Sequence, residues 1–340
     1  MTEIESDKVV NASPLRKYFY GADGLRAGWR LLIFVAILAI LFRLNRQFIR
    51  PLEHGLDDVT DEMVGDIVDF LFFLLASWIM ARIEKRTIAD YGLPWRRMFR
   101  GEFWQGALLG FAALTMLLVT MRAMGIFYFG RIALPGAESL RFAGLYGLAF
   151  LLVALTEEFH FRGYGLFVLS KGIGFWPSAL LISAFFGYSH LGNSGEDWLG
   201  LVNASLGGLF FCFLLRRTGN LWMPIGFHLT WDWGQTFFYG VPDSGLVLPG
   251  HLFSPSTSGP AWLTGGSVGP EGSVLCLPML AVVGFILSRW LREIKYPGLD
   301  PRVRPRDSIP RVDAEPGARP NPRRWEESIK RDFGGSPPEP

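Results

Sequence analysis

The sequence predicts an all-α membrane protein, built as a bundle of about eight transmembrane helices. Half of its 340 residues are hydrophobic and 19% are charged, with a mean hydropathy of +0.26, which is typical of a membrane protein. Eight apolar segments approach the roughly 20 residues that a helix needs to cross the hydrocarbon. Several ionisable residues lie inside these segments, where charge is costly and normally serves a function. We expect this polar site to be buried between the fourth, fifth and seventh helices.

The eight apolar segments have approximate bounds 29–44, 64–83, 104–124, 142–169, 175–191, 199–215, 221–238 and 274–290. The sixth contains Gly207-Gly208, and small residues let helix backbones approach closely in lipid. Cys212 and Cys276 both fall in apolar segments, where we expect small buried side chains. Their number and spacing indicate neither a disulfide framework nor a zinc ribbon.

The distribution of basic residues predicts that both ends of the chain are cytoplasmic. Lys and Arg occur in the N-terminus, in the connection 82–100, at Lys171, at Arg216-Arg217 and after Arg289. The connections 193–198 and 239–273 contain neither residue type. Eight spans place all of these basic connections on the cytoplasmic side, in agreement with the positive-inside rule, and an odd number of spans would break that agreement.

Four parts follow from these bounds: a cytoplasmic N-terminal segment 1–27, a transmembrane bundle 28–295 with its functional core at about 142–240, an extracytoplasmic loop 241–272, and a disordered cytoplasmic tail 296–340. The first apolar segment lacks a small-residue cleavage site after it, so we expect it to be retained. The loop is either a cap on the bundle or simply long. The tail has few apolar residues to bury, and contact with anionic lipid headgroups is the alternative to disorder.

Two carboxylates, a histidine and an arginine interrupt the fourth apolar segment. Glu158 and Arg162 are spaced i,i+4 with the acid first, the orientation in which a helix surface pairs them. Glu157 has no basic partner in register. His160 lies in the same stretch. If segment 142–169 is one helix, this group lies near the middle of the bilayer.

The fifth and seventh segments add His190, and His228 with Asp232. His228 and Asp232 are four residues apart and share one helix face. Three helices that each supply a histidine indicate a shared cavity, which we expect to open towards the cytoplasm. Asp66 and Asp69 are expected in the first turns of the second segment, where a helix N-terminus tolerates acids. These two acids are interpreted as positional and not catalytic.

This set of residues favours hydrolysis by activated water. A carboxylate without a basic partner in a low-dielectric site is suited to take a proton from water and pass it to a leaving group. A serine protease is disfavoured because Gly-x-Ser-x-Gly is absent and Ser189 is expected to point away from its neighbour His190. Glu157-x-x-His160 alone does not make a di-iron site, which needs a second such pair.

A metal is left open by the residues. Glu157, His190, His228 and Asp232 are acceptable zinc ligands, although His-Glu-x-x-His is missing. The cofactor is therefore unknown, with a divalent metal such as zinc among the possibilities. No basic stripe interleaved with aromatic residues indicates a nucleic-acid partner. The expected partners are the lipid bilayer and a peptide or protein substrate at the membrane.

Three motifs in order, Glu157-Glu158-x-x-x-Arg162, Phe186-x-x-x-His190 and His228-x-x-x-Asp232, resemble the CPBP family of intramembrane proteases, also called CAAX prenyl protease type II or Abi. The flanking residues are similar to those of bacterial members, which implies the bacterial inner membrane. The likeness covers about 151–235, with a weaker likeness at 90–93. The resemblance implies a bundle of eight helices with the site in the membrane.

Carried over from that family, Glu157 and His190 would activate the water, and His228 and Asp232 would stabilise the oxyanion. Glu158 and Arg162 would support them. The position of Asp232 is Asn in many relatives, and an Asp donates a hydrogen bond only when it is protonated, which makes a metal-ligand role more plausible. His160 lies outside the family pattern and is interpreted as a supporting or structural residue.

Two other classes of function are compatible with a buried acid and histidine set. A proton-coupled transporter also places such groups at depth, but no inverted repeat of broken helices is visible in the sequence. A membrane scaffold would give these polar residues no function. This is disfavoured because burying ionisable groups in a membrane is costly. The substrate is open among CAAX peptides, bacteriocin leader peptides and other membrane-proximal segments.

Overall fold

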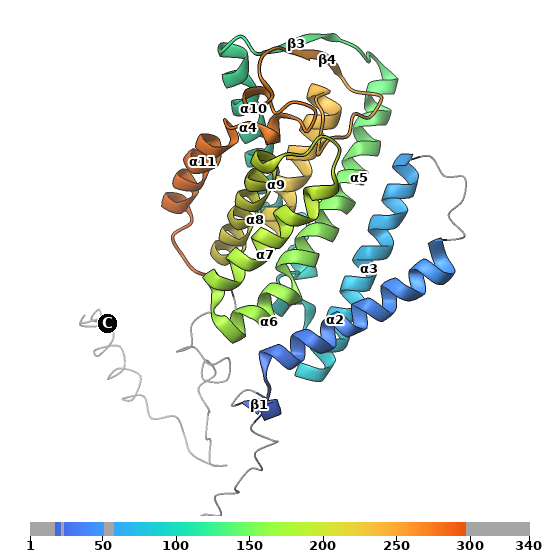
Figure 1. The fold of residues 1–340 in the computed structure, drawn as a ribbon, viewed down its shortest axis with the longest axis vertical. Helices are drawn as coiled ribbons and strands as arrows, with labels where there is room; N and C mark the ends of the chain where they lie inside the picture. The colour runs from blue at the N-terminus through green and yellow to red at the C-terminus, as the bar shows by residue number, and fades with distance from the viewer. Residues whose placement is uncertain (1–17, 22–23, 51–57, 297–340) are drawn as a thin grey trace, which may run out of the picture. The chain divides into compact units, whose positions relative to one another are not determined.

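The computed structural model describes residues 18–21, 24–50 and 58–296, and long helices packed side by side form most of it (Figure 1). The α-helices are α2 (Ala27–Leu44), α3 (Asp58–Glu84), α4 (Gly101–Ala123), α5 (Ala137–Arg162), α6 (Tyr164–Ile173), α7 (Phe175–Ser189), α8 (Trp198–Thr218), α9 (Trp222–Trp233), α10 (Ala261–Thr264) and α11 (Cys276–Trp290). All eight predicted apolar segments are helical. The all-α membrane bundle is therefore confirmed, whereas segment 1–17 and the tail from 297 onward lie outside the described residues.

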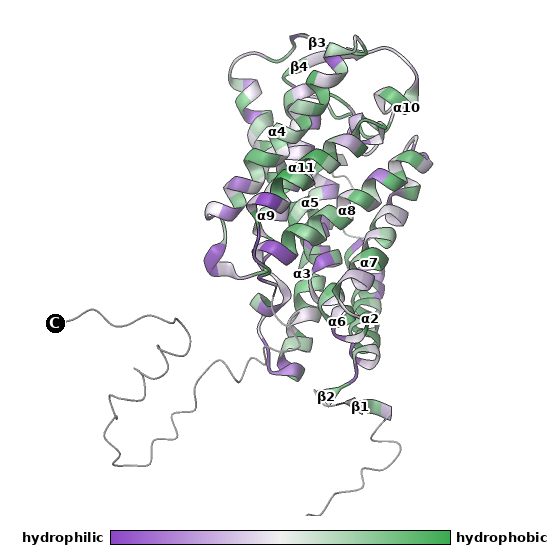
Figure 2. Cartoon of the chain, turned by 90° about the vertical axis from the view of Figure 1, so that its left-hand side faces the viewer, coloured by the Kyte–Doolittle hydropathy of each residue, from purple (hydrophilic) through white to green (hydrophobic). Residues whose placement is uncertain are grey.

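Five helices in the described part are long and apolar enough to cross a membrane, namely Ala27–Ile49, Val59–Glu84, Gly101–Ala123, Ala137–Ile173 and Trp198–Thr218. The shorter helix α11 is also apolar, and Figure 2 shows the long helices coloured mostly as hydrophobic. With 15 residues in α7 and 12 in α9, these two helices are shorter than a full span. The chain is a multi-pass membrane protein.

The predicted fourth segment is divided at Gly163 into α5 and α6. Gly163 has a ψ of −124°, and a Cβ at this position would lie 2.3 Å from the carbonyl oxygen of Phe159. A side chain would therefore clash with the last turn of α5, which explains the glycine at this junction. Because α5 ends at Arg162, the charged group lies in the last turns of a helix and not in its middle.

Residues 241–272, which we call the cap, pack against the bundle. They contain β4 (Phe253–Thr257), which pairs antiparallel with β3 (Phe127–Ile132). The amide nitrogen of Asn203 on α8 donates to the Glu271 carbonyl oxygen at 2.7 Å. Of the two interpretations of this segment, the structure supports the cap. The other strands are the short pair β1 (Tyr20–Gly21) and β2 (Gly24–Leu25).

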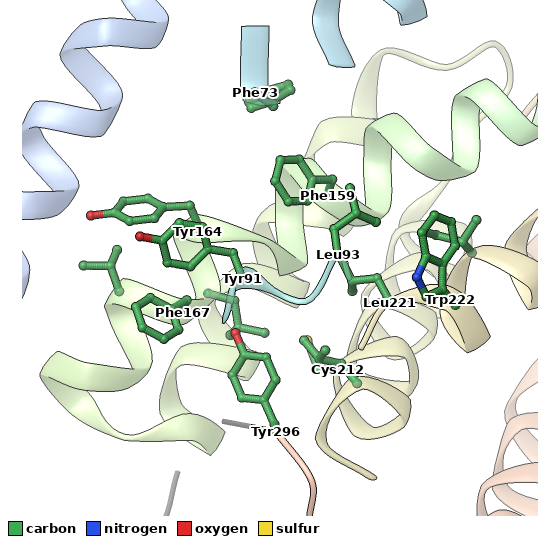
Figure 3. Close-up of a cluster of buried hydrophobic side chains, with 14 of the residues drawn as sticks. Phe73, Tyr91, Leu93, Phe159, Tyr164, Phe167, Cys212, Leu221, Trp222 and Tyr296 are labelled. Carbon is green, nitrogen blue, oxygen red and sulfur yellow. The ribbon is translucent and has the colours of Figure 1, made fainter. Parts of the chain in front are cut away.

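The core consists of two clusters of buried side chains. One lies between α2, α3, α5, α6 and α9, and Figure 3 shows Tyr91, Tyr164 and Phe167 close together in it. Tyr91 and Leu93 from the segment 90–93 are fully buried there, while Asp90 closes a capping box with Thr87. The weaker likeness at 90–93 thus coincides with a turn that packs into this core. The second cluster joins α4, α8, α9 and α11.

Glycines allow α4 and α9 to pack backbone against backbone. A Cβ at Gly106 would lie 2.1 Å from the Met223 carbonyl oxygen, and a Cβ at Gly110 would lie 2.2 Å from that of Phe227. Gly226 makes the reciprocal approach from α9. The sequence prediction missed this contact, although Gly106-x-x-x-Gly110 is the spacing through which membrane helices associate closely.

Replacing Gly110 with Val is expected to destabilise the protein by about 1–3 kcal/mol or more, because overpacking forces the two helices apart. Titration with a denaturing detergent, followed by circular dichroism, measures this change. The matched control is Gly144→Val, since a Cβ at Gly144 on α5 meets no atom within 4 Å. Equal stability of the two variants would contradict a tight α4 and α9 contact.

Candidate functional site

Glu158 and Arg162 form a buried ion pair in the last turns of α5. Arg162 Nη1 lies 3.2 Å from Glu158 Oε1, and both side chains are fully buried. The guanidinium also stacks on the ring of Phe186 from α7, with 4.3 Å to its centroid. The predicted i,i+4 pair is confirmed, and it links α5 to α7.

The same carboxylate oxygen holds His228 from α9. The Nδ1–H of His228 donates to Glu158 Oε1 at 3.1 Å, because a carboxylate oxygen can only accept. On the other side of the ring, Nε2 lies 3.3 Å from Asp232 Oδ2 and 3.7 Å from Glu157 Oε2. His228 is therefore fixed in orientation, with its second nitrogen facing two further acids. The predicted shared face of His228 and Asp232 is also observed.

Exposure separates Glu157 from its neighbours. The Glu157 side chain is 32% exposed, against 9% for Asp232 and none for Glu158. Glu157, His228 and Asp232 all line one cavity of about 770 Å³. Glu157 is thus the acid of this cluster that water reaches most easily.

His190 lines the same cavity from the end of α7. Its Nδ1 lies 2.7 Å from the Phe186 carbonyl oxygen, which fixes the ring. In the described part of the chain, no hydrogen bond or ion pair joins His190 to Glu157 or His228. Ser189 does not point away as predicted, since its Oγ lies 3.4 Å from His190 Nδ1. The prediction assumed a continuing helix, but α7 ends at Ser189 and a 3-10 turn begins at His190.

His160 also lines the cavity, and its ring stacks on Phe73 of α3 at 3.9 Å between centroids. Asp66 and Asp69 lie on the cavity wall as well. The predicted placement of these two acids in the first turns of the helix is wrong, because α3 begins at Asp58 and Asp66 lies more than two turns further along. Their interpretation as non-catalytic stays a prediction.

The cavity extends towards the cap, since Asp243 and Glu271 belong to its wall. This end of the bundle is the one predicted to be extracytoplasmic, so the predicted orientation and the predicted opening towards the cytoplasm do not agree with one another, and both stay predictions. An opening towards the cytoplasm assumes unbroken helices, whereas α5 and α7 end beside the site. Asp243 and Glu271 were missed, although they are the two acids of segment 239–273.

The Asp243 and Glu271 carboxylates share one donor. The amide nitrogen of Gln235 donates to Asp243 Oδ1 at 3.0 Å and to Glu271 Oε2 at 3.3 Å. Burial, together with the charge of Glu271, holds the pKa of Asp243 well above its usual value. The cap therefore adds a second group of acids to the cavity that holds Glu157.

The four predicted metal candidates do not form a metal site in this arrangement. Over the described ranges, no group of three or more His, Cys, Asp or Glu side chains is placed to hold a metal ion. His228 Nδ1 is occupied by Glu158, and His190 lies apart with its Nδ1 on a backbone carbonyl. These residues do not fit a zinc site with three protein ligands.

Gly208 on α8 leaves the space that Arg162 occupies. A Cβ at Gly208 would lie 2.8 Å from Arg162 Nη2 and 3.2 Å from the ring of Phe186. The neighbouring Gly207 has no atom within 4 Å of such a Cβ. The predicted close helix contact is therefore confirmed for Gly208 and wrong for Gly207.

Gly208→Val is expected to displace the Arg162 guanidinium and to destabilise the protein by about 1–3 kcal/mol. Gly207→Val is the control, since its side chain meets open space. Thermal unfolding in detergent measures both variants. An equal loss of stability in the Gly208→Val and Gly207→Val variants would show that Gly208 has no special role beside Arg162.

Comparison with known proteins gives one match. Residues 139–234 match the family model described as type II CAAX prenyl endopeptidase Rce1-like. This segment holds all six predicted site residues, from Glu157 to Asp232. No curated protein and no solved structure matches the chain significantly. The match confirms the resemblance to the CPBP family and indicates a protease.

Proposed function

Because residues 139–234 are similar to the type II CAAX prenyl endopeptidases, we propose that this protein is an intramembrane endopeptidase that cleaves a membrane-associated or lipidated peptide or protein. The observation that supports it most is the partly exposed Glu157 carboxylate, 3.7 Å from His228 in a cavity between α5 and α9. A carboxylate and a fixed imidazole beside the same space are the groups that general acid and base catalysis needs.

In the proposed reaction Glu157 takes a proton from a water molecule, and the oxygen of that water attacks the carbonyl carbon of the peptide bond. The carbonyl oxygen becomes an oxyanion. Glu157 then gives the proton to the amide nitrogen, the C–N bond breaks, and a carboxylic acid and an amine leave. His190, on the same cavity wall, is proposed to orient the water.

His228 and Asp232 are proposed to donate a hydrogen bond to the oxyanion. With Nδ1–H directed at Glu158, Nε2 lies 3.3 Å from Asp232 Oδ2. An imidazole lone pair and a carboxylate repel one another at this distance, so the pair has to hold a proton. That proton first lies between the two groups, and it is proposed to turn to the oxyanion as negative charge develops there. A protonated Asp232 can then donate, as the Asn of many relatives does.

The proposal places the protein in a bacterial inner membrane with both termini in the cytoplasm, as its basic connections predict. The test uses the purified full-length protein in liposomes with a membrane-anchored reporter peptide. We expect two products whose masses add up to the peptide plus one water. Solute flux across the liposomes without any cleavage would favour the proton-coupled transporter instead.

A further inference from the structure

The cavity is lined by acids well beyond the proposed catalytic residues. They come from three parts of the chain: Glu62, Asp66 and Asp69 from α3, Glu196 from the connection after α7, and Asp243 and Glu271 from the cap. Among the residues described, no Lys or Arg lines this cavity. A concave site with walls of one sign concentrates ligands of the opposite charge.

A second observation concerns hydrogen bonding. Asn203 on α8 lines the cavity and is 5% exposed. Its amide nitrogen donates to the carbonyl oxygens of Glu271 and Ser273, which fixes the orientation of the amide. Its Oδ1 is buried and has no hydrogen-bond partner in the described structure, and the same holds for Asp66 Oδ2. Buried acceptors without a donor are costly, so they favour a ligand that brings N–H groups.

The cap adds a reason for positive charge in particular. Asp243 and Glu271 share the amide of Gln235, and their other donors are neutral: the Thr236 hydroxyl for Asp243, and the backbone N–H and hydroxyl of Ser244 for Glu271. The raised pKa of Asp243 reflects burial and the neighbouring carboxylate. A cation between the two acids would remove this repulsion.

We propose that the cap end of the cavity binds a Lys or Arg side chain of the substrate close to the bond that is cleaved, with Glu271, Asp243 and Asn203 as specificity-determining residues. This inference rests on the proposed endopeptidase function. An ammonium or guanidinium group carries several donors on a long stem, which suits acceptors spread over a cavity of about 770 Å³. A bare metal ion needs its ligands gathered at one point, and the described residues hold no such group.

The test compares two membrane-anchored peptides that differ at one residue, Lys or its uncharged isostere norleucine, scanned over the positions around the cleaved bond. With the full-length wild-type protein, we expect kcat/KM for the best Lys peptide to exceed that of its norleucine partner by about tenfold or more. A charge-assisted hydrogen bond contributes enough free energy for a ratio of this size. Glu271→Gln is expected to bring this ratio close to one, with the larger loss of kcat/KM for the Lys peptide. Glu138→Gln, an exposed acid of α5 away from the cavity, is the control.

A ratio near one in the wild-type protein would overturn the inference and leave the proposed function standing. An equal loss of kcat/KM for both peptides in Glu271→Gln would show that Glu271 has a structural role. If Glu271→Gln does not fold, Glu196→Gln, at another part of the cavity wall, gives the same comparison. Equilibrium binding of a fluorescent Lys peptide is measured separately. Binding that prefers Lys without any cleavage would instead refute the endopeptidase. Displacement of that peptide by Ca²⁺ or Mg²⁺ would assign the acids to a metal and overturn the inference.

Discussion

Glu157→Gln is expected to lower the rate of peptide cleavage by about 10²- to 10⁴-fold, the usual contribution of a general acid and base. The amide fills nearly the same volume but cannot take a proton from water. The side chain is partly exposed and its interaction with His228 is longer than a hydrogen bond, so folding should be unaffected. Initial rates with the membrane-anchored reporter peptide measure the loss, and circular dichroism checks the fold.

Glu62→Gln is the matched control for this prediction. Glu62 is an acid on the wall of the same cavity, but it belongs to α3 and has no contact with His228 in the described structure. With an uncharged reporter peptide, we expect its rate to stay within a few-fold of the wild-type rate. A similar loss in both variants would show that the cavity needs negative charge and that Glu157 has no proton-transfer role. Full activity of Glu157→Gln would refute the mechanism.

The parts of the site that depend on spacing within one helix could be predicted from the sequence. Glu158 and Arg162 pair because residues four apart share a helix face, and His228 meets Asp232 for the same reason. The gathering of α5 and α9 around the cavity was also expected, since isolated charge in apolar segments needs an interior. The roles of these residues in catalysis stay predictions.

The errors concern the ends of helices. Gly163 ends α5, so Glu157 and Glu158, expected near the middle of one long helix, lie in the last turns of α5. The 3-10 turn at His190 ends α7. Hydrophobicity alone does not place the break at Gly163, because the segments 142–156 and 164–169 on its two sides are both apolar. The acids of the cap were missed for a related reason. A segment rich in Gly and Pro has no periodicity that shows which of its side chains point into a cavity.

The second large effect is expected for Arg162→Met, which should destabilise the protein by about 3–5 kcal/mol. The cost arises because Glu158 is fully buried and would lose the guanidinium that lies 3.2 Å away. Removing one partner of a buried pair leaves an uncompensated charge. Denaturing detergent titrations measure the loss, with Arg122→Met as the control, an exposed residue in the last turn of α4. Equal stability of the two variants would contradict the buried pair.

Combining Arg162→Met with Glu158→Gln separates charge compensation from positioning. If the single variant is unstable because of the unpaired charge, the double variant should recover much of its stability, since neither partner is then ionised. Cleavage should not recover with it. Glu158 also accepts the hydrogen bond from His228 Nδ1, and a neutral amide holds this ring less firmly for its contact with Asp232. Recovery of both stability and cleavage would show that the buried pair serves the fold alone and that His228 is oriented by other groups.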